Sequence, residues 1–209
     1  MPTAALGVTS CGCAAVVWAS AAGFDSTQDL IPVVRTGSVL FAAAAATCLE
    51  DSNAEVVVTT SFGLLRYRSL SVTLTGLATV ALWWVVVLGA ALIDRDANGA
   101  GLPAAGLAVE LVALCAFGWV VASLLQRGAA WRGTGVRSAA IVVVAALFTL
   151  GHRLSLEWLW AAPGPTWRAT HAHWAAVGLL AALGFVVLGR DPAARAGLAR
   201  VRPAGEVGT

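Results

Sequence analysis

The sequence predicts an all-α, polytopic membrane protein with six transmembrane helices and with both termini in the cytoplasm. Of its 209 residues, 59% are hydrophobic and only 11% are charged, whereas a soluble globular domain carries roughly 25% charged residues. Several apolar stretches approach the ~20 residues that a spanning helix needs. So few charges cannot cover a water-exposed surface, which excludes a soluble enzyme, a disordered protein and a nucleic-acid binder. We expect a lipid bilayer to surround most of the chain.

The expected spans follow one another along a single transmembrane domain, residues 1–189. They cover residues 4–24, 33–49, 70–93, 102–125, 138–160 and 173–188. The first has no basic residues before it, unlike a signal peptide, so we expect it to be a mature helix. The fifth is apolar only as far as Gly151 and continues to Trp160 as a partly exposed helix. The polar residues 190–209 are interrupted by proline and glycine, and we expect a mobile cytoplasmic tail there.

The arginines predict the orientation, because cytoplasmic connections carry an excess of basic residues. One set of connections, with the C-terminal tail, holds nine: Arg66, Arg68, Arg127, Arg132, Arg137, Arg190, Arg195, Arg200 and Arg202. The other set holds four: Arg35, Arg95, Arg153 and Arg168. We therefore expect the first set in the cytoplasm, and an even number of spans then brings both termini to that side.

The connection between the second and third expected spans has a helix-start pattern. Ser52 followed by Glu55 forms a capping box, in which the serine accepts from a free backbone amide and the glutamate reaches back to the cap. Acidic residues here also suit the positive end of a helix dipole. The pattern predicts a short cytoplasmic helix that begins at Asn53 and ends before Gly63. A solvated loop with an incidental cap explains the same residues.

The run from Cys48 to Glu55, the polar group Thr59-Thr60-Ser61 and the arginines before the third span resemble the permease subunits of ABC exporters of the drug- and polysaccharide-export type. The resemblance implies a short coupling helix, about residues 53–61, that contacts a separate ATPase subunit. It also implies a second permease subunit, the same or a related chain, and ATP and Mg on the partner ATPase with no cofactor on this chain. Carried over residue by residue, it assigns ATPase coupling to Glu50, Asp51, Ser52, Asn53, Glu55, Thr59, Thr60, Arg66 and Arg68.

A second polar cluster lies on the opposite side, between the fifth and sixth expected spans. Its aromatic and imidazole residues are His152, Trp158, Trp160, Trp167, His171 and His173. Tryptophan favours the membrane interface, so we expect an external interface region. Imidazoles also bind transition metals and haem, which leaves open a metal or haem site. However, His171 and His173 are two positions apart and would point in different directions on a helix.

Two charges lie within apolar stretches. Glu110 is the one acidic residue well inside an expected span, and such a charge faces the protein interior or a water-filled path. We expect it to be protonated or paired across a subunit interface. Arg35, near the outer end of the second span, is expected to extend its guanidinium to the interface.

The function expected from the sequence is that of a non-enzymatic permease subunit in the plasma membrane of a bacterium. The chain has no lysine, which the nucleotide-binding loop of a P-loop ATPase requires, so hydrolysis would occur on a partner chain. Two alternatives stay open. One is a membrane redox or haem-handling protein that uses His152, His171 and His173, and the other is a membrane scaffold subunit that transports nothing.

Overall fold

Five helices make up the part of the chain that the computed structural model describes, which is residues 27–49, 64–93, 102–128, 134–150 and 164–189. They are α2 (Thr27–Thr47), α4 (Leu64–Ile93), α5 (Ala104–Gly128), α6 (Thr134–Leu150) and α7 (Trp167–Gly189). The all-α class is therefore confirmed for these residues. The expected first span, the short helix over 53–61 and the tail from residue 190 lie outside them, so the count of six spans and the side of the termini stay predictions.

Four of these helices are long and apolar enough to cross a membrane. The qualifying windows are Leu30–Thr47, Arg66–Gly89, Ala104–Gln126 and Trp167–Leu188. At about 1.5 Å rise per residue, the windows of 22 to 24 residues reach across a hydrocarbon core about 30 Å thick, and the window of 18 residues, Leu30–Thr47, nearly does so. These four helices are those of a multi-pass membrane protein. The fifth helix, α6, is apolar over the shorter stretch Thr134–Phe148.

Several helices begin earlier than the hydrophobic pattern predicts, because polar residues occupy their first turns. The second expected span starts at Thr27 instead of residue 33, although Pro32 has no N–H to donate within the helix. The third starts at Leu64, so Arg66 and Arg68 belong to the helix itself. The last starts at Trp167, after a turn in which the Trp167 N–H donates to the Gly164 carbonyl.

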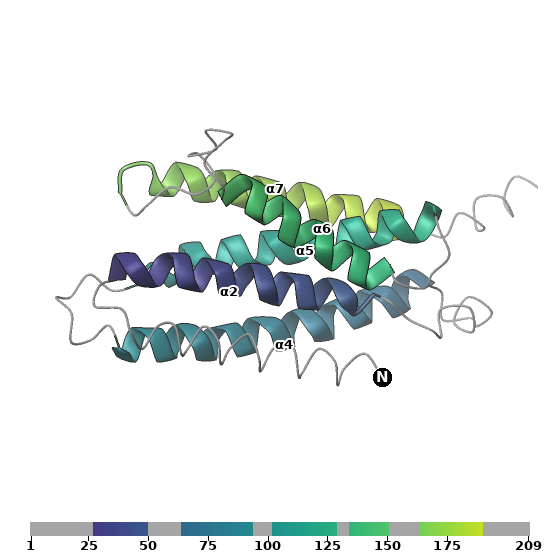
Figure 1. Ribbon diagram of the computed structural model, residues 1–209. Coiled ribbons are helices and arrows are strands. Elements are labelled where there is room, and N and C mark those ends of the chain that lie inside the picture. The colour runs from purple at the N-terminus through teal and green to yellow at the C-terminus, as the bar shows by residue number, and fades with distance from the viewer. Residues whose placement is uncertain (1–26, 50–63, 94–101, 129–133, 151–163, 190–209) are drawn as a thin grey trace, which may run out of the picture.

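The helices form an antiparallel bundle around α2 and α5 (Figure 1). The starts of α2, α5 and α7 lie at the same end as the finishes of α4 and α6. We call this the triad end, after the three residues described below, and the opposite one the arginine-rich end. Helix α5 packs against each of the other four described helices, and α2 packs against α4, α5 and α6.

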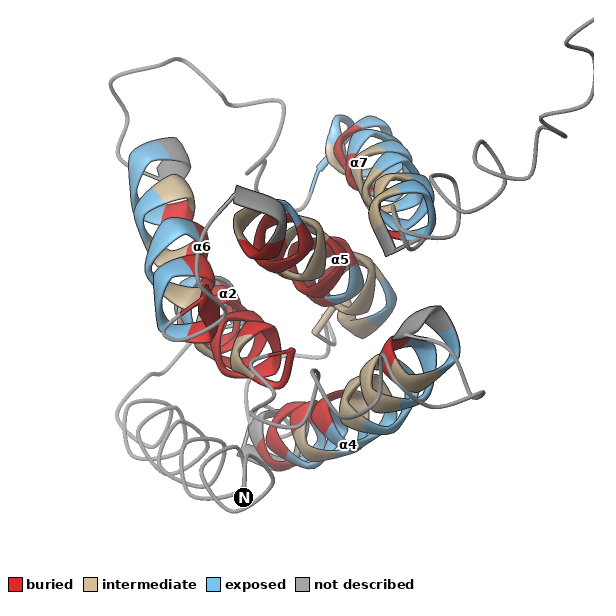
Figure 2. Cartoon of the chain, turned by 90° about the vertical axis from the view of Figure 1, so that its right-hand side faces the viewer, coloured by how far each residue is buried: buried red, intermediate tan, exposed pale blue. Residues whose placement is uncertain are grey.

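Burial follows this arrangement. Figure 2 shows α2 and α5 largely buried, whereas α4, α6 and α7 have exposed outer faces. These faces carry large apolar side chains, including Leu77, Val144, Phe148 and Leu180, each more than 60% exposed. A soluble protein seldom exposes so much apolar surface, but lipid tails would cover it.

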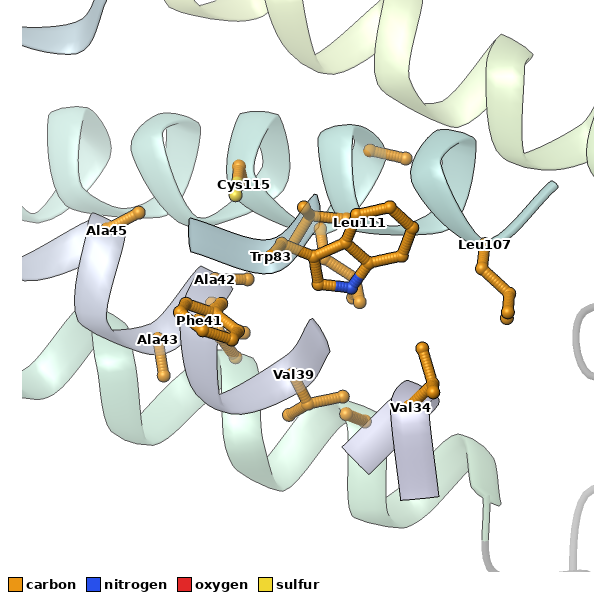
Figure 3. Packing of buried hydrophobic residues seen from close by; sticks show 14 of the residues in the cluster. Val34, Val39, Phe41, Ala42, Ala43, Ala45, Trp83, Leu107, Leu111 and Cys115 are labelled. Carbon is orange, nitrogen blue, oxygen red and sulfur yellow. The ribbon is translucent and has the colours of Figure 1, made fainter. Parts of the chain in front are cut away.

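Small residues allow the inner helices to approach closely. A side chain at Gly118 of α5 would place its Cβ 3.0 Å from the Ala46 Cβ of α2 and 3.2 Å from Val142 Cγ2 of α6. The labelled side chains in Figure 3, among them Phe41, Leu111 and Trp83, belong to the buried apolar cluster, to which all five described helices contribute. Close approach through small residues is the usual mode of helix packing in membranes.

We expect Gly178→Val to loosen α7 from α5. A Cβ at Gly178 would lie 3.3 Å from both the Cα and the Cβ of Ala113, so the branched side chain must push the two helices apart. The free energy of unfolding should fall by about 1–3 kcal/mol, measured by denaturant titration in mixed micelles. Ala176→Val, at an exposed position of the same helix, is the control and should leave stability within about 0.5 kcal/mol of the parent. Equal stability of the two variants would contradict this packing.

Candidate functional site

Three charged or ionisable side chains meet inside the bundle at the triad end. Arg35 comes from α2, Glu110 from α5 and His171 from α7. Each lies within the first three turns of its helix, and the three helices begin at the same end of the bundle (Figure 1). We call these three residues the triad. They are distant in sequence, and only the packing of α2 and α7 against α5 brings them together.

The centre of the triad is a bidentate ion pair. The Arg35 Nε donates to Glu110 Oε2 at 2.9 Å, and Arg35 Nη2 donates to Oε1 at 2.7 Å. Arg35 is 6% exposed and Glu110 is 1% exposed. The parallel fork of two charge-assisted hydrogen bonds is the strongest geometry available to an arginine and a carboxylate.

His171 completes the triad from the other side of the carboxylate. Its Nδ1 lies 2.7 Å from the backbone carbonyl oxygen of Trp167, one turn earlier in α7, and its Nε2 lies 3.1 Å from Glu110 Oε1. The second contact is within ion-pair distance, although the ring N–H direction does not align well enough for a hydrogen bond. The side chain is 11% exposed, so the ring lies close to the surface at this end.

Trp167 covers the triad. Its ring lies 4.1 Å from the His171 ring, centroid to centroid, and the Arg35 Cζ lies 5.5 Å from its centroid. Both the stacking and the cation–π contact favour positive charge next to the indole face. Gly106 of α5 leaves the space for these rings, since a Cβ there would lie 2.6 Å from His171 Nε2 and 2.8 Å from Trp167 Cζ2.

The arrangement corrects two expectations from the sequence. Arg35 does not extend to the interface, because its guanidinium turns inward to the Glu110 carboxylate. Glu110 is paired within its own chain, so no second subunit is needed to compensate its charge. A buried carboxylate without a cation would be costly in a medium of low dielectric constant, and Arg35 supplies that cation.

The predicted external cluster is divided by the structure. Within it, His171 belongs to the triad and Trp167 covers the triad, whereas His173 is exposed on α7. The different directions of His171 and His173 agree with their two-residue spacing. His152, Trp158 and Trp160 lie outside the described residues.

Each ring nitrogen of His171 has a polar group of the chain beside it. One ring nitrogen faces a backbone carbonyl and the other faces the Glu110 carboxylate. In the described part of the chain, no group of three or more His, Cys, Asp or Glu side chains is arranged to hold a metal ion.

At the arginine-rich end, neutral side chains hold the end of α2. The last carbonyls of a helix have no partner within it. Here the Trp119 Nε1 donates to the Ala45 carbonyl at 3.1 Å, and the Gln126 Nε2 donates to the Leu49 carbonyl at 2.6 Å. Both donors belong to α5. The turn at Cys48 and Leu49, which follows α2, is therefore hydrogen-bonded to α5.

The residues predicted to couple to an ATPase are only partly described. Glu50, Asp51, Ser52, Asn53, Glu55, Thr59 and Thr60 lie outside the described residues. Arg66 is exposed and Arg68 is buried in the first turns of α4. The exposed position of Arg66 fits an arginine that meets lipid headgroups, but the burial of Arg68 does not.

The sequence contained a signal for the triad that residue-by-residue reasoning missed. Arg35 and Glu110 are opposite charges inside apolar stretches, and both lie nearer the same predicted side of the membrane. Two such charges are expected to pair.

No protein-family model, curated protein or solved structure matches this chain.

We expect the Arg35–Glu110 pair to show strong coupling in a double-mutant cycle. Arg35→Met or Glu110→Leu alone leaves one buried charge without its partner and should lower the free energy of unfolding by about 3–5 kcal/mol. The double variant should be much less destabilised than the sum of the two, because it leaves no unpaired charge on α2 or α5. Denaturant titration in mixed micelles measures the free energy of unfolding of the parent, the two single variants and the double variant. Additive single effects would contradict a buried pair.

Proposed function

We propose that this chain is the transmembrane subunit of an ATP-driven ABC transporter of the export type. The observation that carries the proposal is the hydrogen bond that the Gln126 side chain of α5 donates to the Leu49 carbonyl. Residue 50 begins the segment that resembles a coupling helix, and it follows Leu49 directly in the sequence. A force applied to residues 50–63 would therefore reach α5, the helix that packs against every other described helix.

Helices α2 and α5 are suited to move as one body. Hydrogen bonds from Trp119 and Gln126 join them at the arginine-rich end, and the Arg35–Glu110 pair joins them at the triad end. In the proposed cycle, ATP and Mg bind to the partner ATPase, and its closure displaces the coupling segment. The α2–α5 unit then tilts relative to a second permease subunit and switches the pathway between its inward- and outward-facing states. Only a difference in affinity between the two states allows ATP binding to drive this switch.

The charge distribution supports the orientation. The coupling segment joins the end of α2 to the beginning of α4, and both attachment points lie at the arginine-rich end. By the sequence count, nine arginines lie in the helix ends, connections and tail on that side and four on the other, which favours the arginine-rich end as cytoplasmic. Six spans with both termini in the cytoplasm of a bacterial cell complete the proposal.

Neither alternative gains a specific observation. A redox or haem protein would use His152 with His171 and His173, and His152 lies outside the described residues. A scaffold subunit would need neither the buried triad nor the hydrogen bond between Gln126 and the Leu49 carbonyl.

Reversing the charges of the coupling segment should release the ATPase. In the triple variant Glu50→Lys, Asp51→Lys, Glu55→Lys, three acids that face the proposed partner become basic. We expect at least a tenfold loss of a nucleotide-binding ATPase from affinity-purified permease, quantified by mass spectrometry, with loss of transport-linked ATP hydrolysis.

The control reverses acids in the connection at the triad end, with Asp94→Lys and Asp96→Lys. It should retain the ATPase at the parental level. Co-purification of an ATPase with the triple variant at the parental level, or its absence from the parent, would refute the proposal.

A further inference from the structure

The contacts of the His171 ring determine where its protons are. The Trp167 carbonyl oxygen can only accept a hydrogen bond, so the Nδ1 that lies 2.7 Å from it carries a proton. In a neutral ring, the Nε2 would then hold a lone pair. That lone pair would lie 3.1 Å from Glu110 Oε1, which is also an acceptor.

We propose that the triad is a proton-binding site, in which His171 holds a second proton on Nε2 and is an imidazolium. With this proton, the contact at 3.1 Å joins a cation to a carboxylate and is attractive. The protonated Nε2 then points its positive charge at the Glu110 carboxylate, whereas in the neutral ring a lone pair of Nε2 would face a lone pair of Oε1. When a proton binds to Nε2, the neutral His171 ring becomes an imidazolium, and no other bond changes. The proposal does not depend on a partner ATPase.

Glu110 is not the proton's site. Both carboxylate oxygens accept from Arg35, at 2.7 and 2.9 Å, and this fork requires an ionised carboxylate for its full strength. The face of Trp167 also stabilises positive charge on the ring 4.1 Å away. The loaded triad thus holds two cations around one anion.

The charged groups around His171 come from α2, α5 and α7 itself. Arg35 and Glu110 are the ones in contact with the triad, and Arg168 and His173 on α7 itself are exposed. On α4, the titratable side chains described belong to the arginine-rich end: Arg66, Tyr67 and Arg68. None of these is an anion that could replace Glu110 as the partner of the imidazolium.

Proton binding at this site affects the docking of α7. His171 is a polar link between the second turn of α7 and α5, because its Nε2 meets Glu110. Without the proton, two acceptors face each other, and the Trp167 turn is pushed away from Gly106. The site lies at the end of the bundle, since His171 belongs to the second turn of α7 and its side chain is 11% exposed. The triad therefore couples the proton concentration on that side to the packing of α7.

The test is nitrogen NMR of the full chain labelled with ¹⁵N-histidine in lipid bilayers, at about pH 5, 7 and 8, which bracket the usual range of histidine titration. The His171 signals are assigned by their loss in His171→Gln. We expect both His171 nitrogens to show the protonated shift at about pH 7. In Glu110→Gln, which keeps the shape and removes the anion, one nitrogen should lose its proton at that pH. The signals of His173 provide the internal reference and should be the same in both proteins.

A wild-type His171 that is neutral at about pH 7 would overturn the proposal without any variant having to fold. An imidazolium that persists in folded Glu110→Gln would overturn it as well, because the carboxylate would then have no role in holding the proton. Should Glu110→Gln not fold, the pH dependence of thermal unfolding replaces it. The difference in transition temperature between wild type and His171→Gln should shrink as pH rises from about 5 to 8, and a constant difference refutes the proposal.

Discussion

The buried pair between Arg35 and Glu110 is the interaction on which the arrangement of the inner helices depends. Both residues lie on apolar helices, and their side chains are almost completely buried. In such surroundings an unpaired charge costs several kcal/mol, so the helices cannot rotate or slide past one another without losing the compensation. The fork of two hydrogen bonds therefore fixes the register of α2 against α5, and the contact to His171 fixes the start of α7 against the same carboxylate.

The rest of the bundle is held by weaker and less specific contacts. At the arginine-rich end, neutral donors of α5 satisfy the last carbonyls of α2. In the middle, the Trp83 indole donates to Ser38 Oγ at 2.9 Å and so links α4 to α2. Elsewhere small residues allow close packing, as at Gly118 and Gly178. A charged contact at one end and neutral contacts at the other give α2 and α5 the character of a single unit, to which the outer helices are attached.

The sequence predicted the helices well, because long apolar runs are a strong signal. Four expected spans coincide with α2, α4, α5 and α7 apart from their first turns, and the fifth coincides in part with α6. The starts were misjudged because polar residues such as Arg66 or His171 can lie within a helix when its first turn is at an interface or is paired. Periodicity does not show which faces of two helices meet, so the sequence predicted a protonated Glu110 or a partner in another subunit and not Arg35 of the same chain. The sequence likewise placed His171 with the interface tryptophans, because its contact with Glu110 depends on how α5 packs against α7.

The central claim is that the coupling segment faces the cytoplasm and that the triad end faces outward. It is tested most directly by labelling intact cells with a maleimide that cannot cross the membrane. Cys11, Cys13, Cys48 and Cys115 are first replaced by alanine, and a single cysteine is then introduced by Asn53→Cys or by Asn98→Cys, between α4 and α5. The account predicts labelling at position 98 in intact cells and at position 53 only after the cells are opened. Labelling of position 53 in intact cells would contradict it.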